Sequence, residues 1–307
     1  MQPELQTEEA VLKEMLALDR ARVKRGHSVE RVSITRWRDA KREDLTDEVA
    51  GEEPMEIRVR VPTTDGWQQH SIAVTMRTPG NDFELAAGFL HAEGAVHGAD
   101  DIERIGYCTD VEEDQQYNIV TVYLAPHVDF DTERLSRHVF TTSSCGICGK
   151  AALDWVQTSC PQKPLGDFVL EPEKLFSMHR ALEQSQSLFA RTGGLHASAL
   201  YDLEGKLQSQ REDVGRHNAT DKLVGKLLLD RQLPASESVI LFSGRAAFEL
   251  VHKSILAGIP FLAAVGAPSS LAVELARRYG VTLVGFLRDG RFNVYSGAER
   301  MRWPTPA

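Results

Sequence analysis

Between residues 239 and 286 short apolar runs alternate with helical patterns, and this alternation restricts how the second half of the chain can fold. The runs and the helical patterns follow one another in the order 239–242, 246–257, 261–265, 270–279 and 282–286. Strands separated by helices return in the same direction and pair in parallel. The pattern therefore predicts an α/β fold with a parallel sheet, followed by a terminal hairpin that turns at 288–291 and leads to 292–295.

The ends of these predicted strands carry loops with the composition of anion sites. Ser243, Gly244 and Arg245 follow the first strand, 266–270 follows the second, and 286–291 follows the third. In open α/β sheets, ligands bind beyond the carboxyl ends of the strands, and free N–H groups at helix starts suit phosphate. Each loop alone is better explained as an ordinary glycine turn or helix cap, but together they predict an anionic, nucleotide-like ligand. None matches a Walker loop or a G-x-G-x-x-G fingerprint.

A further loop, 213–218, contains Arg216 and His217 and precedes another helical pattern. Asn218, with Asp221 three residues later, is predicted to cap that helix.

A turn rich in Ser and Gly, 141–150, places Cys145 and Cys148 three residues apart before an apolar helical pattern. A thiol beside a helix start is shifted toward the thiolate by backbone N–H groups, and Lys150 acts in the same direction. The pair is consistent with half a zinc site, a dithiol redox centre or a sulfur carrier. It is also consistent, though less so in such a turn, with two buried, unreactive cysteines.

The first half of the chain has the pattern of an α+β unit. We expect an amphipathic helix over 8–25 and a connection over 39–54. A hairpin with strands at 55–61 and 72–76 follows, and then a helix from Asn81 to Gly94 with a capping box. A strand over 117–124 and a short helix over 134–140 complete this half. A helix that begins at Pro172 and ends at Gly193 follows the cysteine turn.

Composition excludes several classes of protein. With 307 residues and 42% hydrophobic content, the chain can bury a substantial core in one or two domains. The longest weakly polar run, 255–268, is interrupted by Gly258 and Pro260 and is too short for a membrane span. The net charge of −9 argues against nucleic acid as a partner. No signal-peptide pattern is present, and four cysteines in so long a chain are no disulfide framework, so we expect a cytoplasmic protein.

Five separated motifs, in this order, resemble those of the FdhD/NarQ family of formate dehydrogenase accessory sulfurtransferases. They are the segments 144–149 (SCGICG), 192–197 (TGGLHA), 212–219 (EDVGRHNA), 243–245 (SGR) and 283–286 (LVGF), and the likeness extends over about residues 30 to 300.

The resemblance implies a cytoplasmic, dimeric sulfur carrier. It would accept sulfur from a cysteine desulfurase as a persulfide on Cys145, with Cys148 assisting or resolving, and pass it to the bis-molybdopterin guanine dinucleotide cofactor of formate dehydrogenase. A guanine nucleotide such as GDP would mimic that cofactor. The segment that the family uses to contact the cofactor corresponds to Phe286, Leu287, Arg288, Asp289, Gly290 and Arg291.

The implied organisation is a helical extension over 1–29, a smaller α+β domain over 30–140, and a cytidine-deaminase-like α/β domain over 141–307. A zinc-dependent deaminase is disfavoured, because the sequence at His196 lacks the glutamate of H-x-E and Ser144 stands where P-C-x-x-C has proline, so no metal site is expected. A cofactor chaperone without sulfur chemistry would keep the arginines and make no use of the cysteines. A thioredoxin-like redox role is weaker, because the cysteine pair does not follow a convincing strand.

Overall fold

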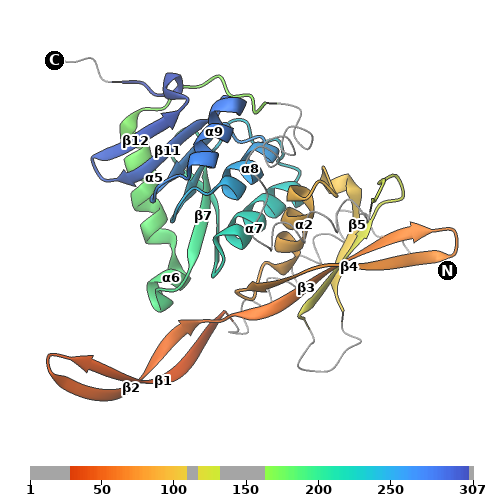
Figure 1. Ribbon diagram of the computed structural model, residues 1–307, viewed down its shortest axis with the longest axis horizontal. Helices are drawn as coiled ribbons and strands as arrows, with labels where there is room; N and C mark the ends of the chain where they lie inside the picture. The colour runs from red at the N-terminus through yellow and green to blue at the C-terminus, as the bar shows by residue number, and fades with distance from the viewer. Residues whose placement is uncertain (1–27, 109–116, 132–162, 304–307) are drawn as a thin grey trace, which may run out of the picture.

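The computed structural model describes residues 28–108, 117–131 and 163–303, which form a mixed α/β architecture (Figure 1). The larger sheet contains β7 (His196–Tyr201), β8 (Leu207–Asp213), β9 (Val239–Phe242), β10 (Phe261–Ala264), β11 (Thr282–Arg288) and β12 (Arg291–Ser296). Its order is β12-β11-β10-β9-β7-β8. The expected parallel pairing is confirmed for β9, β10 and β11, and the terminal hairpin for β11 and β12.

Helices cover both faces of this sheet because its central strands are apolar on both sides. Ile240 packs with the apolar cluster formed with α7 (Arg216–Leu229), α8 (Phe248–Leu256) and α9 (Ser270–Tyr279). Leu241, the next residue, belongs to the cluster formed with α5 (Pro172–Ser185) on the other face. Side chains that alternate between two buried faces explain why β9 reads as a continuous apolar run.

The smaller sheet contains β3 (Glu53–Thr63), β4 (Gly66–Arg77), β5 (Ile102–Tyr107) and β6 (Ile119–Leu124) in the order β4-β3-β6-β5. The predicted hairpin and the strand before residue 125 are therefore confirmed. Helix α2 (Asp82–Ala92) packs on this sheet, and the same apolar cluster includes Leu228 and Leu229 of α7. Short 3-10 helices lie at Ala99–Asp101 and Ala298–Arg300.

The predicted connection over 39–54 is wrong. Strands β1 (Val29–Arg38) and β2 (Lys41–Ala50) pair along their whole length as a two-stranded ribbon that reaches away from the rest of the molecule (Figure 1). The turn uses Asp39 and Ala40, both with positive φ. Charged residues conceal the strand pattern, because a ribbon open to solvent tolerates them along most of its length.

Local details at three helices also differ from expectation. The single helix predicted from Pro172 is divided at Gln186 into α5 and α6 (Ser187–Thr192). Asn81 has a left-handed backbone and makes no side-chain cap, and α7 begins at Arg216 with Gly215 as its N-cap, so both predicted capping boxes are wrong. The reason is tertiary: Glu84 and Asn218 bind partners in other segments.

The helices predicted over 8–25 and 134–140 lie outside the described residues. Within the described part of the chain, none of the helices has both the length and the apolar character needed to cross a membrane.

Candidate functional site

The cysteine turn with Cys145 and Cys148 lies outside the described residues, so the site is built here from the strand-end loops. These loops adjoin one another through their backbones. Gly266 N–H donates to the Gly244 carbonyl at 2.8 Å, and Phe286 N–H donates to the Gly266 carbonyl at 3.0 Å. A Cβ atom on Gly266 would lie 2.9 Å from the Gly244 oxygen, so this approach requires glycine. The structure therefore brings the three loops together as one edge.

Ser243 and Arg245 have different roles at this edge. The Ser243 hydroxyl accepts a hydrogen bond from Ala197 N–H at 2.8 Å, which holds the end of β9 against the start of β7. The Arg245 side chain is exposed, three residues after the end of β9. Ser243 thus shapes the loop, whereas the Arg245 guanidinium is available to a ligand.

The hairpin 286–291 divides its residues between the core and the surface. Phe286 is 46% exposed and has φ 54°, a backbone conformation that bulky residues rarely adopt. Leu287 is buried in the apolar core, so only its backbone faces this edge. Arg288 donates to the Val265 carbonyl at 2.6 Å, and Asp289 accepts from Arg180 at 2.9 Å. Gly290 takes a positive φ at the turn, and Arg291 is exposed.

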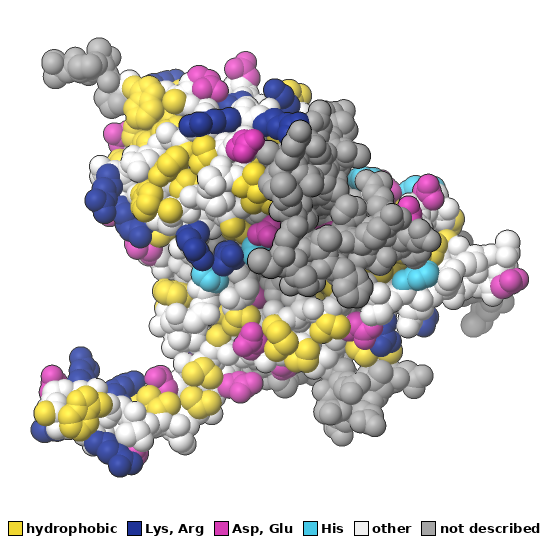
Figure 2. Space-filling view, viewed as in Figure 1, with side chains coloured by type: hydrophobic (Ala, Val, Ile, Leu, Met, Phe, Trp, Pro, Cys, Tyr) yellow, Lys and Arg dark blue, Asp and Glu magenta, His cyan; other side chains and the backbone are white. Residues whose placement is uncertain are grey.

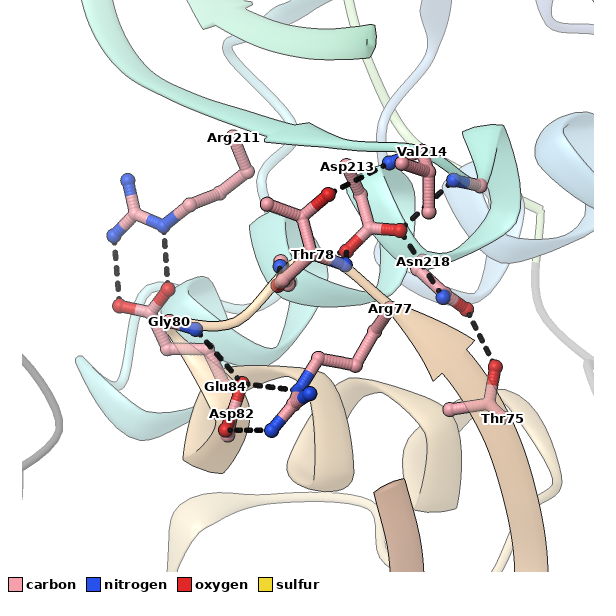
Figure 3. A network of polar contacts seen from close by, with 12 residues as sticks. Thr75, Arg77, Thr78, Gly80, Asp82, Glu84, Arg211, Asp213, Val214 and Asn218 are labelled. Carbon is pink, nitrogen blue, oxygen red and sulfur yellow. Dashed lines mark hydrogen bonds and ion pairs between the residues drawn. The ribbon is translucent and has the colours of Figure 1, made fainter. Parts of the chain in front are cut away.

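The loop 213–218 reaches the same edge because β8 ends at Asp213, opposite His196, which lies beside Gly244. The Asp213 carboxylate is buried and accepts several hydrogen bonds (Figure 3). One carboxylate oxygen accepts from Thr78 N–H at 3.1 Å and lies 2.7 Å from Lys222 Nζ. The other accepts from Gly215 N–H at 2.8 Å and from the Asn218 amide at 3.2 Å. Asp213 therefore fixes the backbone immediately before Arg216 and His217.

Arg216 and His217 each have a buried nitrogen without a hydrogen bond, Nε and Nε2 respectively. His217 Nε2 lies 2.8 Å from a Glu249 carboxylate oxygen, close enough for an ion pair but without hydrogen-bond alignment. His217 lowers the pKa of Glu249, against the opposing effect of burial. A buried donor without an acceptor is costly, and an anion bound beside Arg216 would satisfy it.

His196 joins this basic group, although sequence reasoning gave it no role. It stands opposite Asp213 in the β7–β8 register, and a Cβ atom on Gly244 would lie 3.2 Å from its Nδ1. Burial lowers the pKa of His196, and the nearby Arg216, His217 and Arg245 lower it further, against the effect of Asp213, which raises it. The surroundings therefore favour the neutral imidazole, which can accept as well as donate a hydrogen bond. Its signal in the sequence was its place in the motif 192–197.

Sequence reasoning also missed the contacts that hold this region to the smaller sheet. Arg211 of β8 forms a two-pronged ion pair with Glu84 of α2 (Figure 3). Arg211 and Glu84 are 127 positions apart in the sequence, so no helical or strand periodicity could predict their contact. Among the residues that the structure describes, no His, Cys, Asp or Glu side chains gather in a group of three that could hold a metal ion.

Comparison with known proteins gives matches over most of the chain. The model of the FdhD/NarQ family matches residues 51–302. A sulfur carrier protein FdhD of Streptomyces coelicolor is 50% identical over 281 residues, which cover 90% of this chain and 96% of that protein. The protein of the same name from Sulfurisphaera tokodaii is 41% identical over 274 residues, 89% of this chain and 99% of that protein.

A solved structure is similar over most of the chain. It is a crystal structure of a candidate formate dehydrogenase accessory protein from Desulfotalea psychrophila, with a TM-score of 0.67 and 29% identity, covering 89% of this chain and 99% of that one.

Proposed function

This chain belongs to the FdhD/NarQ family, and on that premise we propose that it is a cytoplasmic sulfur carrier required for formate dehydrogenase activity. It receives sulfur from a cysteine desulfurase as a persulfide on Cys145. It then delivers the sulfur to bis-molybdopterin guanine dinucleotide, which is its substrate, before that cofactor enters formate dehydrogenase. The names of the relatives support the carrier role, and the C-G-x-C-G turn at Cys145 supplies the thiol.

Loading and delivery are both exchanges at sulfur. The Cys145 thiolate attacks the outer sulfur of the desulfurase persulfide, the S–S bond of the donor breaks, and the donor cysteine leaves as a thiolate. For delivery as sulfide, Cys148 attacks Cys145 Sγ. The persulfide bond breaks, sulfide leaves, and a Cys145–Cys148 disulfide remains, which a thiol reductant must reopen before the next cycle. This disulfide balances the two electrons carried away by the sulfide.

The observation that carries the binding half of the proposal is the orphaned Nε of Arg216 at the strand-end edge. Phosphate oxygens are acceptors that a guanidinium binds in a fixed geometry. Arg216, His217 and Arg245 would hold the pyrophosphate groups. The exposed Phe286 ring and the hairpin through Arg288 to Arg291 would contact the rest of the dinucleotide.

The experiment has two readouts on the full-length protein. Mass spectrometry after incubation with a cysteine desulfurase and cysteine measures sulfur loading, and calorimetry with GDP measures binding at the edge. Cys145→Ser should lose the added sulfur and keep GDP binding, with Cys108→Ser as the matched control. Arg245→Ala should load sulfur normally but bind GDP about ten to a hundredfold more weakly, because one charged hydrogen bond is lost. Arg277→Ala, at the far end of α9, is its control.

Either readout can contradict the proposal. Full loading of Cys145→Ser would place the persulfide elsewhere. GDP binding by a protein that never accepts sulfur would instead describe a cofactor chaperone without sulfur chemistry.

A further inference from the structure

The smaller sheet exposes apolar side chains on the face that turns away from α2. Ile57 of β3 is fully buried in the cluster that includes α2. Successive residues alternate between faces and cross-strand partners share one. Val74, opposite Glu56, and Met76, opposite Pro54, therefore lie on the other side, which is called the outer face here. Val74 is 68% exposed and Met76 49%, so this end of the outer face leaves large apolar side chains in solvent.

The other end of the outer face carries two cations around one aromatic ring. Arg60 of β3 and Arg104 of β5 both stand opposite Tyr123 of β6, so the three residues form a row across the sheet. The Arg104 guanidinium lies 3.5 Å from the centre of the Tyr123 ring, and Arg60 donates to the Tyr123 hydroxyl at 3.1 Å. These contacts hold both guanidinium groups in place without removing their charge. Their remaining N–H groups are available to an anion.

The acidic side chains on this face do not neutralise the two guanidinium groups. Glu56 is paired with Arg58 at 2.7 Å. Among the described residues, Glu103, next to Arg104 in the chain, forms no ion pair, and neither do Arg60 and Arg104 themselves. An occupant that fits the outer face would therefore carry apolar side chains at one end and carboxylates at the other.

The N-terminal segment, residues 1–27, has this character in its sequence. The helix predicted over 8–25 has an apolar stripe formed by Val11, Leu12, Met15, Leu16 and Leu18. Glu8, and Glu4 one turn earlier, continue the stripe toward the N-terminus at helical spacing. The other end of the segment adjoins Ser28, whose carbonyl accepts from Gly51 N–H at 2.9 Å, two residues before β3. Ser28 also precedes the ribbon, which stands apart at lower left in Figure 2.

Lengths along the segment and along the sheet agree. Arg60 lies nine residues after Gly51, which is about 30 Å at the rise of an extended strand. Glu8 lies twenty residues before Ser28, and a helix of that length also spans about 30 Å. The apolar stripe would then pass over Val74, which is about half as far from Gly51. The order of apolar and acidic groups in the segment thus matches the order of apolar and basic groups on the outer face.

We propose that segment 1–27 docks as a helix along the outer face of the smaller sheet. Its acidic start lies on the guanidinium groups of Arg60 and Arg104, and its apolar stripe covers Val74 and Met76. The covalent link at Ser28 keeps the segment at a high effective concentration beside this face, which an acidic surface of another protein lacks. The docked helix gives the smaller sheet a second covered face, opposite α2. This contact is separate from the strand-end edge and independent of the sulfur chemistry.

Charge exchange within the full-length chain tests this docking. The segment variant carries Glu4→Lys and Glu8→Lys, and the sheet variant carries Arg60→Glu and Arg104→Glu. Hydrogen exchange measured by mass spectrometry reports on the backbone amides of 8–25, which a docked helix protects. In each variant these amides should exchange about tenfold faster or more, because charged contacts are lost and like charges meet. The combined variant, with all four charges reversed, should recover most of the wild-type protection.

The matched control is Lys13→Glu, a charge reversal on the opposite side of the predicted helix from Glu8, which should leave the protection unchanged. Recovery in the combined variant shows that the sheet variant is folded. Three results would overturn the docking. In the first, the wild-type amides of 8–25 exchange as in an unfolded chain, which would leave the outer face to another acidic partner. In the second, both variants exchange as the wild type does, and in the third the combined variant fails to recover.

Discussion

Glu93, Asp221 and Lys253 form a charged cluster where α2, α7 and α8 meet. Lys253 Nζ binds both carboxylate oxygens of Asp221, which is buried. Burial raises the pKa of Asp221, and Lys253 opposes the shift. Glu93 lies beside this pair with one carboxylate oxygen buried and without a hydrogen bond. Burial raises its pKa to about 7, with Lys253 lowering it and Asp221 raising it. The Lys253 ammonium group is therefore the positive charge nearest to both carboxyl groups, those of Asp221 and Glu93.

Glu93 should make the protein less stable as the pH rises. Its folded pKa of about 7 lies above its ordinary value of 4.5, so its favourable contribution is complete below pH 4.5 and is lost as the pH rises to 7. In Glu93→Gln the charge is absent. The variant should therefore gain free energy of unfolding relative to wild type between pH 5 and 8, by up to about 3 kcal/mol. Denaturant titrations across this range measure the gain, and the exposed Glu103→Gln is the control. A difference that does not change with pH would contradict the assignment.

Helices α2 and α7 are the elements whose contact joins the two sheets. They meet at Gly88 and Gly225. A Cβ atom on Gly88 would lie 1.9 Å from the Asp221 carbonyl oxygen, and one on Gly225 would lie 1.8 Å from that of Glu84. The two backbones thus approach more closely than any side chain allows. Leu228 and Leu229 of α7 are consequently buried in the apolar cluster of the smaller sheet.

Gly88→Ala or Gly225→Ala should force the helices apart and destabilise the fold. We expect a loss of roughly 1 to 3 kcal/mol or more in each, as for other overpacked cores, even though alanine favours the helix itself. Thermal unfolding measures the loss. Gly106→Ala is the matched control, because a Cβ atom there meets nothing within 4 Å. Wild-type stability in both helix variants would show that the helices are not in close contact.

At the scale of the whole molecule, buried ion pairs connect the smaller sheet to the larger one. Asp213 of β8 and Lys222 of α7 are both buried, 2.7 Å apart. Asp213 accepts from the N–H of Thr78, which follows β4 (Figure 3), and Lys222 donates to the Thr78 carbonyl. Arg211 and Glu84 add a second connection. If one sheet unfolded alone, the charged groups on the other sheet would lose their partners. The two sheets should therefore unfold together.

Asp213→Asn should lower the stability of the whole protein and loosen the loop before Arg216. Removing one partner of a buried ion pair costs about 3 to 5 kcal/mol. Calorimetry should show one transition in the wild type and one, at lower temperature, in the variant. Asp65→Asn, at an exposed turn position, is the control for the same chemical change. Two separate transitions in the wild type would contradict the coupling of the sheets.

The parallel centre of the larger sheet, and the edge where its loops gather, could be predicted from the sequence alone. Periodicity is a local property, so alternating apolar runs and helical patterns were enough to identify β9, β10 and β11. Parallel strands end at the same edge, and the adjacency of Gly244, Gly266 and Phe286 followed from that rule. The family motifs added the cysteine turn, whose role stays a prediction because it lies outside the described residues.

Contacts between distant segments, by contrast, could not be predicted from the sequence. No periodic pattern in the sequence indicated the antiparallel strands β7 and β8 or the pairing of β1 with β2. The position of His196 beside Gly244 had no such signal either. The two capping boxes failed for the same reason, since Glu84 binds Arg211 and Asn218 binds the Met76 carbonyl. Whether a side chain binds a local or a distant partner depends on the total free energy of the folded molecule. Sequence spacing describes the local partners alone.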